Sequence, residues 1–247
     1  SVTTSAGGNA TAVPWRDKYL PGTKVKLTAT AEEGWLFMGW KGNAAGSELE
    51  TEITINGDTD VSAQFNPDPL IYVVEGNSVT ITDCDDSASG ALVIPSSYNG
   101  KPVTAIGFGA FTDCSSLTSV TIPASVTSIP PLAFLKCRGL TSVMIPDSVT
   151  SIGREAFDGC SAMKSLTIPD SVNSIGSEAF TGCSSLTSLT IPDSVTSIGD
   201  RAFNMCDSLT SVTIPDSITS IGMGAFYSCS DLTSVTIPDS VTSIGAW

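Results

Sequence analysis

A 23-residue period governs the sequence from Ala110 onward and limits the folds that the chain can adopt. The dipeptide Ala-Phe recurs six times at this spacing; a Cys follows each Phe by three residues, and a Pro follows each Cys by nine. The phenylalanines are Phe111, Phe134, Phe157, Phe180, Phe203 and Phe226, and the cysteines are Cys114, Cys137, Cys160, Cys183, Cys206 and Cys229. A unit this short cannot bury its own apolar face, so consecutive copies must stack and share one core. The period therefore predicts a solenoid.

Each unit also carries the apolar spacing of a short strand. In the first copy Leu117, Val120 and Ile122 face inward, and Pro123 ends the strand because it has no N–H to donate. A second apolar pair predicts a short extended stretch on the opposite side. We expect the Phe and Cys to share the inner face of a short helical or 3₁₀ turn, entered through a tight glycine bend. The bend glycines are Gly153, Gly176, Gly199 and Gly222.

Stacking in register turns every position into a column, about 4.8 Å between rungs. The Phe and Cys columns are predicted to be buried, while the polar residues of the strand form an outer surface, here called the hydroxyl face. Its members are Ser119, Thr121, Ser142, Met144, Ser165, Thr167, Ser188, Thr190, Ser211, Thr213, Ser234 and Thr236. It lacks the Trp, Tyr and Arg that dominate interface energies, so it fits either a solvated strand face or an adhesive one. An ice-binding threonine array is a further alternative, but curvature of the solenoid would spoil its flatness.

The seven cysteines allow three interpretations. Adjacent coils would place Cα atoms within disulfide range, but side chains stacked in register point the same way. Zinc favours ligand pairs two to four residues apart, and the sequence has no such pair. Buried free thiols are therefore predicted, with no metal and no cofactor. Cys84 lies outside the column and is either exposed or capped.

Acidic residues offer two more candidate sites. One is an in-register column of aspartates, Asp147, Asp170, Asp193, Asp216 and Asp239. Calcium sites need several oxygens per loop, so each Asp is predicted instead to stabilise its turn by bonding the backbone two residues on. The other is the acidic loop around Asp83, Asp85 and Asp86, which could serve a hydrolase but has the pattern of a solvated turn.

Composition excludes several functions. The chain has 11 Lys and Arg against 25 Asp and Glu, a net charge of −14, which repels nucleic acid. Histidine is absent, which removes the commonest general base and the Ser-His and Cys-His nucleophile pairs, so no enzyme is predicted. Without an apolar run of about eighteen residues or a signal-peptide layout, we expect a soluble chain, mature or trimmed, that does not span a membrane.

The repeat Ala-Phe-x-x-Cys-x-x-Leu-x-x-Val-x-Ile-Pro-x-Ser-Val-x-x-Ile-Gly resembles the BspA-like leucine-rich repeats of bacterial surface proteins. The resemblance covers about residues 70–247, with a cap and an irregular first repeat over 70–109 and regular repeats over 110–247. Members of that family are associated with adhesion to host matrix proteins, other bacteria and host cells. The resemblance implies that this chain is a secreted or cell-surface bacterial protein.

The first 66 residues lack the period. Alternating apolar residues predict strands over 22–30, 51–55 and 60–65, hence a small β-rich domain. The segments Gly-Thr-x-Val-x-Leu-Thr-Ala and Gly-Trp-x-Phe-x-Gly-Trp resemble the divergent B-repeat family related to internalin B. Trp35 and Trp40 are either core residues or a sugar-stacking platform. Residues 67–69 predict a short stiff linker.

The expected fold is thus mainly β: a leucine-rich-repeat solenoid of 23-residue units with short helical or 3₁₀ turns, preceded by a small β-rich domain. The expected function is that of an adhesin presenting its repeat face to an extracellular protein or glycan. The alternative is a structural spacer or display module with no ligand of its own. Trp247 could cap the last coil, mark a trimmed array, or take part in end-to-end self-association at the C-terminal coil.

Overall fold

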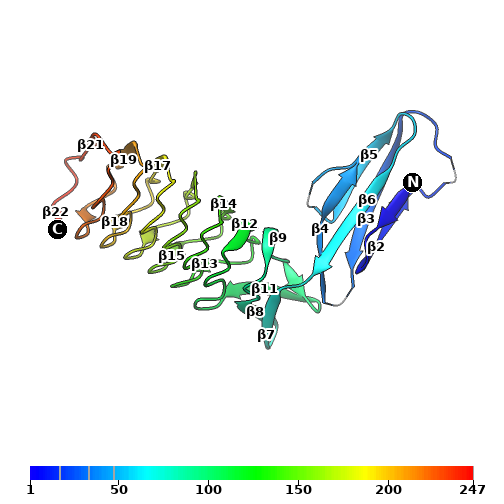
Figure 1. The fold of residues 1–247 in the computed structure, drawn as a ribbon, viewed down its shortest axis with the longest axis horizontal. Helices are drawn as coiled ribbons and strands as arrows, with labels where there is room; N and C mark the ends of the chain where they lie inside the picture. Colours follow the sequence, from blue (N-terminus) through cyan, green and yellow to red (C-terminus); the bar gives the residue numbers. More distant parts are fainter. Residues whose placement is uncertain (17, 33, 47, 247) are drawn as a thin grey trace. The chain divides into compact units, whose positions relative to one another are not determined.

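The computed structural model describes residues 1–16, 18–32, 34–46 and 48–246, and Trp247, with the roles suggested for it, lies outside them. Throughout these ranges the chain forms strands and turns, with no helix that could cross a membrane. It divides into two compact units, Ser1–Pro69 and Leu70–Trp247 (Figure 1).

Two three-stranded sheets make up the first unit, which confirms the predicted β-rich domain. One sheet has the order β1-β6-β4 and the other the order β2-β3-β5. The strands are β1 (Val2–Thr4), β2 (Gly8–Val13), β3 (Thr23–Ala31), β4 (Trp35–Gly42), β5 (Glu50–Ile55) and β6 (Val61–Pro67). Strands β2, β3 and β5 pair antiparallel, while β1 runs parallel to β6. Because side chains alternate along a strand, every second residue of β3 and β6 enters a shared core, to which β4 adds Phe37 and Trp40.

The tryptophans of β4 belong to this core rather than to a sugar platform. Trp40 is buried, and its indole Nε1–H donates a hydrogen bond of 3.0 Å to the Glu48 carbonyl. Trp35 is half-buried and lies against Gly7, where a Cβ atom would come within about 2.0 Å of the indole. Phe37 packs edge-on against Trp40 with ring centroids 5.4 Å apart. One end of the unit is thus filled by aromatic rings.

The first unit continues to Pro69. Pro67 is the last residue of β6 and is paired with Trp35, and the Asp68 N–H donates to the Gly34 carbonyl at 2.9 Å. The segment 67–69, predicted as a linker, therefore begins as part of the sheet.

Irregular strands open the second unit. Strands β7 (Leu70–Glu75) and β8 (Ser78–Cys84) form an antiparallel hairpin, and β11 (Lys101–Ile106) runs parallel to β8. The short β10 (Ser97–Tyr98) pairs with β11, and β9 (Ser89–Val93) pairs instead with the first regular coil. Their inward residues are fully buried, so these strands close one end of the repeat core.

The regular coils stack in register, which confirms the solenoid. Each coil contributes a back strand, the Ser-Ile pair, and each coil except the third contributes a front strand from its Leu-x-x-Val-x-Ile segment. The front strands are β12 (Ser116–Thr121), β14 (Ser142–Met144), β17 (Ser188–Thr190), β19 (Ser211–Thr213) and β21 (Val235–Thr236). The back strands are β13 (Ser128–Ile129), β15 (Ser151–Ile152), β16 (Ser174–Ile175), β18 (Ser197–Ile198), β20 (Ser220–Ile221) and β22 (Ser243–Ile244). The back strands form one continuous six-stranded parallel sheet.

The segment that carries Phe and Cys is not helical, contrary to expectation. In the third coil Glu155 and Gly159 both have positive φ, 54° and 73°. A left-handed residue at each end interrupts any helix, and the chain makes successive turns instead, closed by hydrogen bonds from Ala156 N–H to Gly153, Asp158 N–H to Glu155 and Cys160 N–H to Phe157. The segment is held by its neighbours: the Phe134 N–H donates to the Ala156 carbonyl of the next coil at 2.7 Å.

The regularly spaced bend glycines are needed for a different reason from the one predicted. Gly153, Gly176, Gly199 and Gly222 are not among the glycines with positive φ. A Cβ atom at Gly199 would lie only 2.6 Å from backbone atoms of Gly176 and Ser177 in the preceding coil. Glycine is needed here because the backbones of adjacent coils approach closely, not because the chain bends.

The front of the solenoid is interrupted at the third coil. Strands β9, β12 and β14 form one sheet and β17, β19 and β21 another, while residues 163–168 between them form no strand. Lys164 stands where neighbouring coils have Thr, and the Thr141 hydroxyl donates to the carbonyl of Thr118 one coil earlier at 2.8 Å. Lysine has no hydroxyl for this bond. Leu166 and Ile168 nevertheless stay buried, so the stacking itself continues.

Candidate ligand-binding face

The phenylalanine column lies on the axis of the stack. Successive rings are nearly parallel, with centroids 4.9 to 5.5 Å apart. The first five rings are completely buried, and Phe226 in the last coil is half-buried. Each inner ring therefore has a neighbour on both faces, and this position serves the core.

The cysteine column lies beside the rings as free thiols, buried from Cys114 to Cys206 and half-buried at Cys229. Each thiol from Cys137 onward donates a hydrogen bond to the Phe carbonyl of the preceding coil, which a methyl group could not do. The bonds run from Cys137 to Phe111 (2.9 Å), Cys160 to Phe134 (3.2 Å), Cys183 to Phe157 (3.4 Å), Cys206 to Phe180 (3.4 Å) and Cys229 to Phe203 (3.1 Å). The column thus satisfies a row of buried carbonyls that the sequence pattern did not reveal.

Burial also makes these thiols unreactive. Loss of solvation raises the pKa of Cys137 to about 12 and holds the pKa values of Cys160 and Cys183 well above the ordinary thiol value. The thiolate is the nucleophile and the metal ligand, so neutral buried thiols can serve neither role. Cys84 is buried too, and the Cys114 thiol donates to its carbonyl at 3.8 Å.

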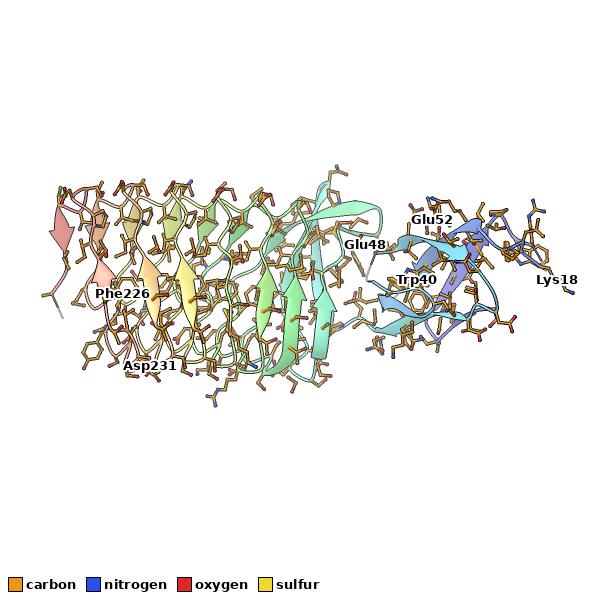
Figure 2. The ribbon with its side chains drawn as sticks, turned by 90° about the horizontal axis from the view of Figure 1, so that it is seen from above. Lys18, Trp40, Glu48, Glu52, Phe226 and Asp231 are labelled. Carbon is orange, nitrogen blue, oxygen red and sulfur yellow. The ribbon has the colours of Figure 1, made fainter. Side chains whose placement is uncertain are left out.

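The hydroxyl face is the outer surface of the front strands. Its residues from Ser165 onward are exposed, whereas Ser119, Thr121 and Ser142 are partly covered. Met144, 68% exposed, lies where the two front sheets are interrupted. Pairing in register sets Thr190 opposite Thr213 and Thr213 opposite Thr236. Side chains of successive coils accordingly form parallel rows along the repeat (Figure 2).

The aspartate column does not stabilise its turns as predicted. All five side chains are exposed, and none accepts a hydrogen bond from a described residue. The residue after Asp147 forms a hydrogen bond instead: the Ser148 hydroxyl donates to the Val126 carbonyl of the preceding coil at 2.6 Å. The turn itself is closed by a hydrogen bond of 3.0 Å from the Val149 N–H to the Pro146 carbonyl. Among the described residues no group of three or more acidic or cysteine side chains is placed to hold a metal ion.

The acidic loop at residues 83–86 is an ordinary turn. Asp85 accepts hydrogen bonds from the Ser87 hydroxyl at 2.6 Å and the Ser87 N–H at 2.8 Å. These bonds lower the pKa of the Asp85 carboxyl. A general acid needs a raised pKa, so this carboxylate is not suited to that role.

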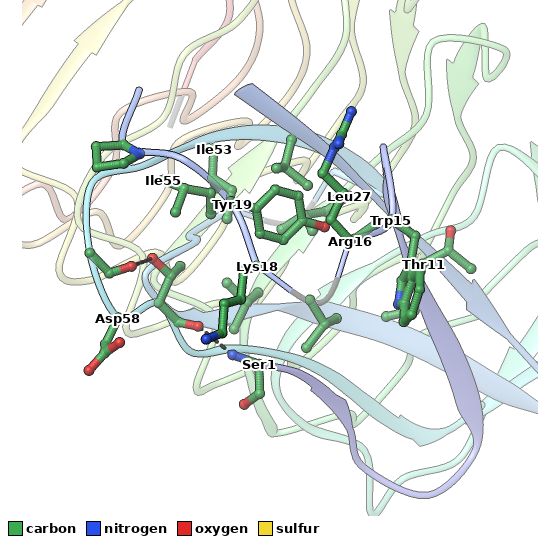
Figure 3. Close-up of a pocket in the computed structure, with 18 residues that line it drawn as sticks. Ser1, Thr11, Trp15, Arg16, Lys18, Tyr19, Leu27, Ile53, Ile55 and Asp58 are labelled. Carbon is green, nitrogen blue, oxygen red and sulfur yellow. Dashed lines mark hydrogen bonds between the residues drawn. The ribbon is translucent and has the colours of Figure 1, made fainter. Parts of the chain in front are cut away.

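A hollow in the first unit was missed by the sequence analysis (Figure 3). Its mouth is formed by the segment between β2 and β3, where Trp15, Arg16, Lys18 and Tyr19 line the opening. The available signal was the density of aromatic and cationic residues between two prolines. Only the pairing of the sheets shows that this segment lies over a concave surface.

The stacked coils, with their inward leucine, phenylalanine and cysteine columns, define a leucine-rich-repeat solenoid. Residues 92–185 and 150–247 match the BspA type Leucine rich repeat region, in 6 copies, and residues 1–69 match the Divergent InlB B-repeat domain. The chain therefore belongs to the BspA-type leucine-rich-repeat family, and its first unit to the divergent B-repeat domains. Proteins of this repeat family are typically found on bacterial surfaces.

Solved structures of bacterial leucine-rich-repeat proteins are similar to this chain. A Treponema pallidum protein is 32% identical, with a TM-score of 0.66 over 72% of this chain and 83% of its own. A Bacteroides ovatus protein is 37% identical (TM-score 0.64), and a leucine-rich cell surface protein of Faecalibacterium prausnitzii is 39% identical (TM-score 0.63). Each matches over 72% of this chain but only 48% and 49% of its own length. The chain thus spans about half of those two proteins. A search of curated proteins found no match.

Proposed function

We propose that this chain is a non-catalytic bacterial surface or secreted binding protein, an adhesin whose hydroxyl face takes an extracellular protein or glycan. The observation that carries the proposal is the in-register row of exposed hydroxyls on β17, β19 and β21. The same donor and acceptor recurs at every coil, about 4.8 Å from its neighbour. A polymer with its own repeat can therefore meet many equivalent sites at once.

The chemistry of this face favours many weak contacts over a few strong ones. A single hydroxyl hydrogen bond contributes only about 0.5–1.5 kcal/mol net. Repetition raises the total, because each further contact forms at the high effective concentration set by the previous one. Met144 and Lys164 add an apolar and a cationic contact at the interruption between the two front sheets.

One observation favours a second candidate, a spacer or display module. The hydroxyl face contains no Trp, Tyr or Arg, the residues that supply most of the energy in protein interfaces. A spacer would use the solenoid only for its length and stiffness.

Binding to an array of extracellular-matrix proteins and glycans distinguishes the two. The Thr190→Arg/Thr213→Arg variant places two bulky cations on the hydroxyl face and is expected to weaken binding by about tenfold or more through steric and desolvation penalties. The matched control is Thr196→Arg/Thr219→Arg, at exposed positions just before the back strands, which should bind as the wild type does. If the two variants bind the ligand equally well, the binding site is not on the hydroxyl face. If the wild-type protein binds no ligand reproducibly at micromolar concentration, the spacer function is favoured.

A further inference from the structure

The hollow of the first unit arises from an uneven distribution of side-chain size between its two sheets. At one end, Phe37 and Phe65 meet with ring centroids 5.5 Å apart. At the other end β2 contributes only Ala10 and Ala12, and the structure there has an open hollow of about 820 Å³. This volume lies within the range of about 300–1,000 Å³ that is usual for small-molecule sites.

The floor of the hollow is apolar. Its accessible part is formed by Ile53 and Ile55 of β5 and by the two alanines of β2, while Val25 and Leu27 of β3 are buried beneath them. A ligand must therefore present an apolar surface to this floor.

The mouth, by contrast, is aromatic and cationic (Figure 3). Trp15 is 75% exposed although it lines the hollow, an unusual exposure for a large apolar side chain. Tyr19 is fixed by a hydrogen bond of 2.8 Å from its hydroxyl to the Pro14 carbonyl, which ties the segment back on itself. The ring of Tyr19 thus has a set position at the opening.

The two cations of the mouth are available to a ligand. Arg16 and Lys18 are exposed, and within the described ranges neither forms an ion pair. Lys24 and Lys26, on the outer face of β3, are instead paired with Glu52 and Glu50 at 2.8 Å each. Asp17 lies between these two cations in the sequence, and the exposed Asp58 also lines the hollow, so an anion would be drawn to the Arg16 and Lys18 side of the mouth and away from Asp58.

We propose that this hollow binds an acidic sugar, a carboxylate-bearing residue of a glycan. The C–H face of a pyranose ring is apolar enough to stack on Trp15 and Tyr19. Its carboxylate would pair with Arg16 and Lys18, where charge-assisted hydrogen bonds are strongest. Asp58 and Thr11 at the rim offer partners for sugar hydroxyls. The site is separate from the hydroxyl face, and the proposal does not depend on the function proposed for the solenoid.

The test is titration of the full chain with a galacturonic acid trisaccharide and with sialyllactose, followed by calorimetry and tryptophan fluorescence. The neutral controls are the methyl ester of the first probe and lactose. Saturable binding of at least one acidic probe is expected, weaker by about tenfold or more for its neutral control because the charge-assisted bonds are lost. Binding of neither acidic probe, or equal binding of the neutral controls, would overturn the proposal.

Variants locate the site. Arg16→Gln/Lys18→Gln and Trp15→Ala change exposed residues and are each expected to weaken binding by about tenfold. The matched control Lys24→Gln/Lys26→Gln removes the same charge from the outer face of β3 and should bind within about twofold of the wild type. Wild-type affinity in both mouth variants would overturn the assignment. So would a hydrophobic tripeptide carboxylate that binds more tightly than either saccharide.

Discussion

The two units of the chain bury apolar side chains in opposite ways. In the solenoid each inward position packs against the equivalent position of the next coil, as the Phe157 ring packs on the Phe180 ring with centroids 5.3 Å apart. The same packing arrangement is therefore repeated from coil to coil. In the first unit each inward position is different, and small residues at one end leave a hollow. A core of regular columns is filled throughout, so only the outer surface of the coils is available to a ligand. An irregular core can also contain a concave binding site.

The same contrast applies to stability. Each coil contacts only its neighbours, so the stability of the solenoid is approximately a sum over coils and the interfaces between them. The first unit has one shared core and should unfold as one cooperative unit.

Phe180→Ala should have the largest effect, because it removes a ring stacked on both faces. We expect the free energy of unfolding of the solenoid to fall by about 3–5 kcal/mol. Urea denaturation followed by far-UV circular dichroism measures the loss. Tryptophan fluorescence, dominated by Trp15, Trp35 and Trp40 of the first unit, should be little changed. Phe226→Ala is the control, since that half-buried ring stacks on one neighbour and its loss should be smaller. Equal losses at the two positions would contradict a continuous column.

Gly199→Ala should come next. The added Cβ would lie 2.6 Å from the backbone of the preceding coil and force the coils apart, at a cost of about 1–3 kcal/mol. Gly182→Ala is the matched control: φ is +69° there, and the nearest atom to a new Cβ is 3.6 Å away. Only the strain of a left-handed backbone, about 1 kcal/mol, is expected at Gly182. A side chain is tolerated at this position, because Met205 occupies the equivalent place in the next coil with a positive φ. Thermal melts that order the two variants the other way would refute the close-approach explanation.

Lys164→Thr should have the smallest effect and the opposite sign. A hydroxyl at this position can donate to the Thr141 carbonyl, as its equivalents do in other coils, for a gain of about 0.5–1 kcal/mol. Hydrogen exchange at residues 165–167 should slow if the front strand forms. Lys164→Val, which has the branched shape without the hydroxyl, separates the hydrogen bond from β-propensity. Unchanged exchange in the Thr variant would show that the interruption has another cause.

The period made most of the solenoid predictable. Identical spacing of Phe and Cys over six copies leaves little choice except stacking, and the family resemblance confirmed by the comparisons follows from the same residues. The turn conformation was not predictable, because the left-handed position before each Cys is Gly159 in one coil but Lys136 or Met205 in others. The glycine column was predicted with the wrong cause, since close approach between coils is a property of the stack and not of one unit.

The first unit was less accessible to sequence reasoning. Alternating residues indicated β3, β5 and β6, with β3 predicted almost to its ends, but β1, β2 and β4 were not predicted. The hollow depends on which inward residues face each other across two sheets, and Ala12 is paired with Leu27 only through the antiparallel register of β2 and β3. That register is set by tertiary structure, so no local pattern reports it.

The thiol-to-carbonyl bonds and the glycine contacts both join a coil to the one just before it, and neither depends on where in the series that coil stands. Recombination can therefore add or remove any whole number of 23-codon units, and the coils on either side of the junction still form the same contacts. A gain or loss of any other length would shift every ring and thiol beyond the junction out of line. Selection on such a gene would act on length in discrete steps.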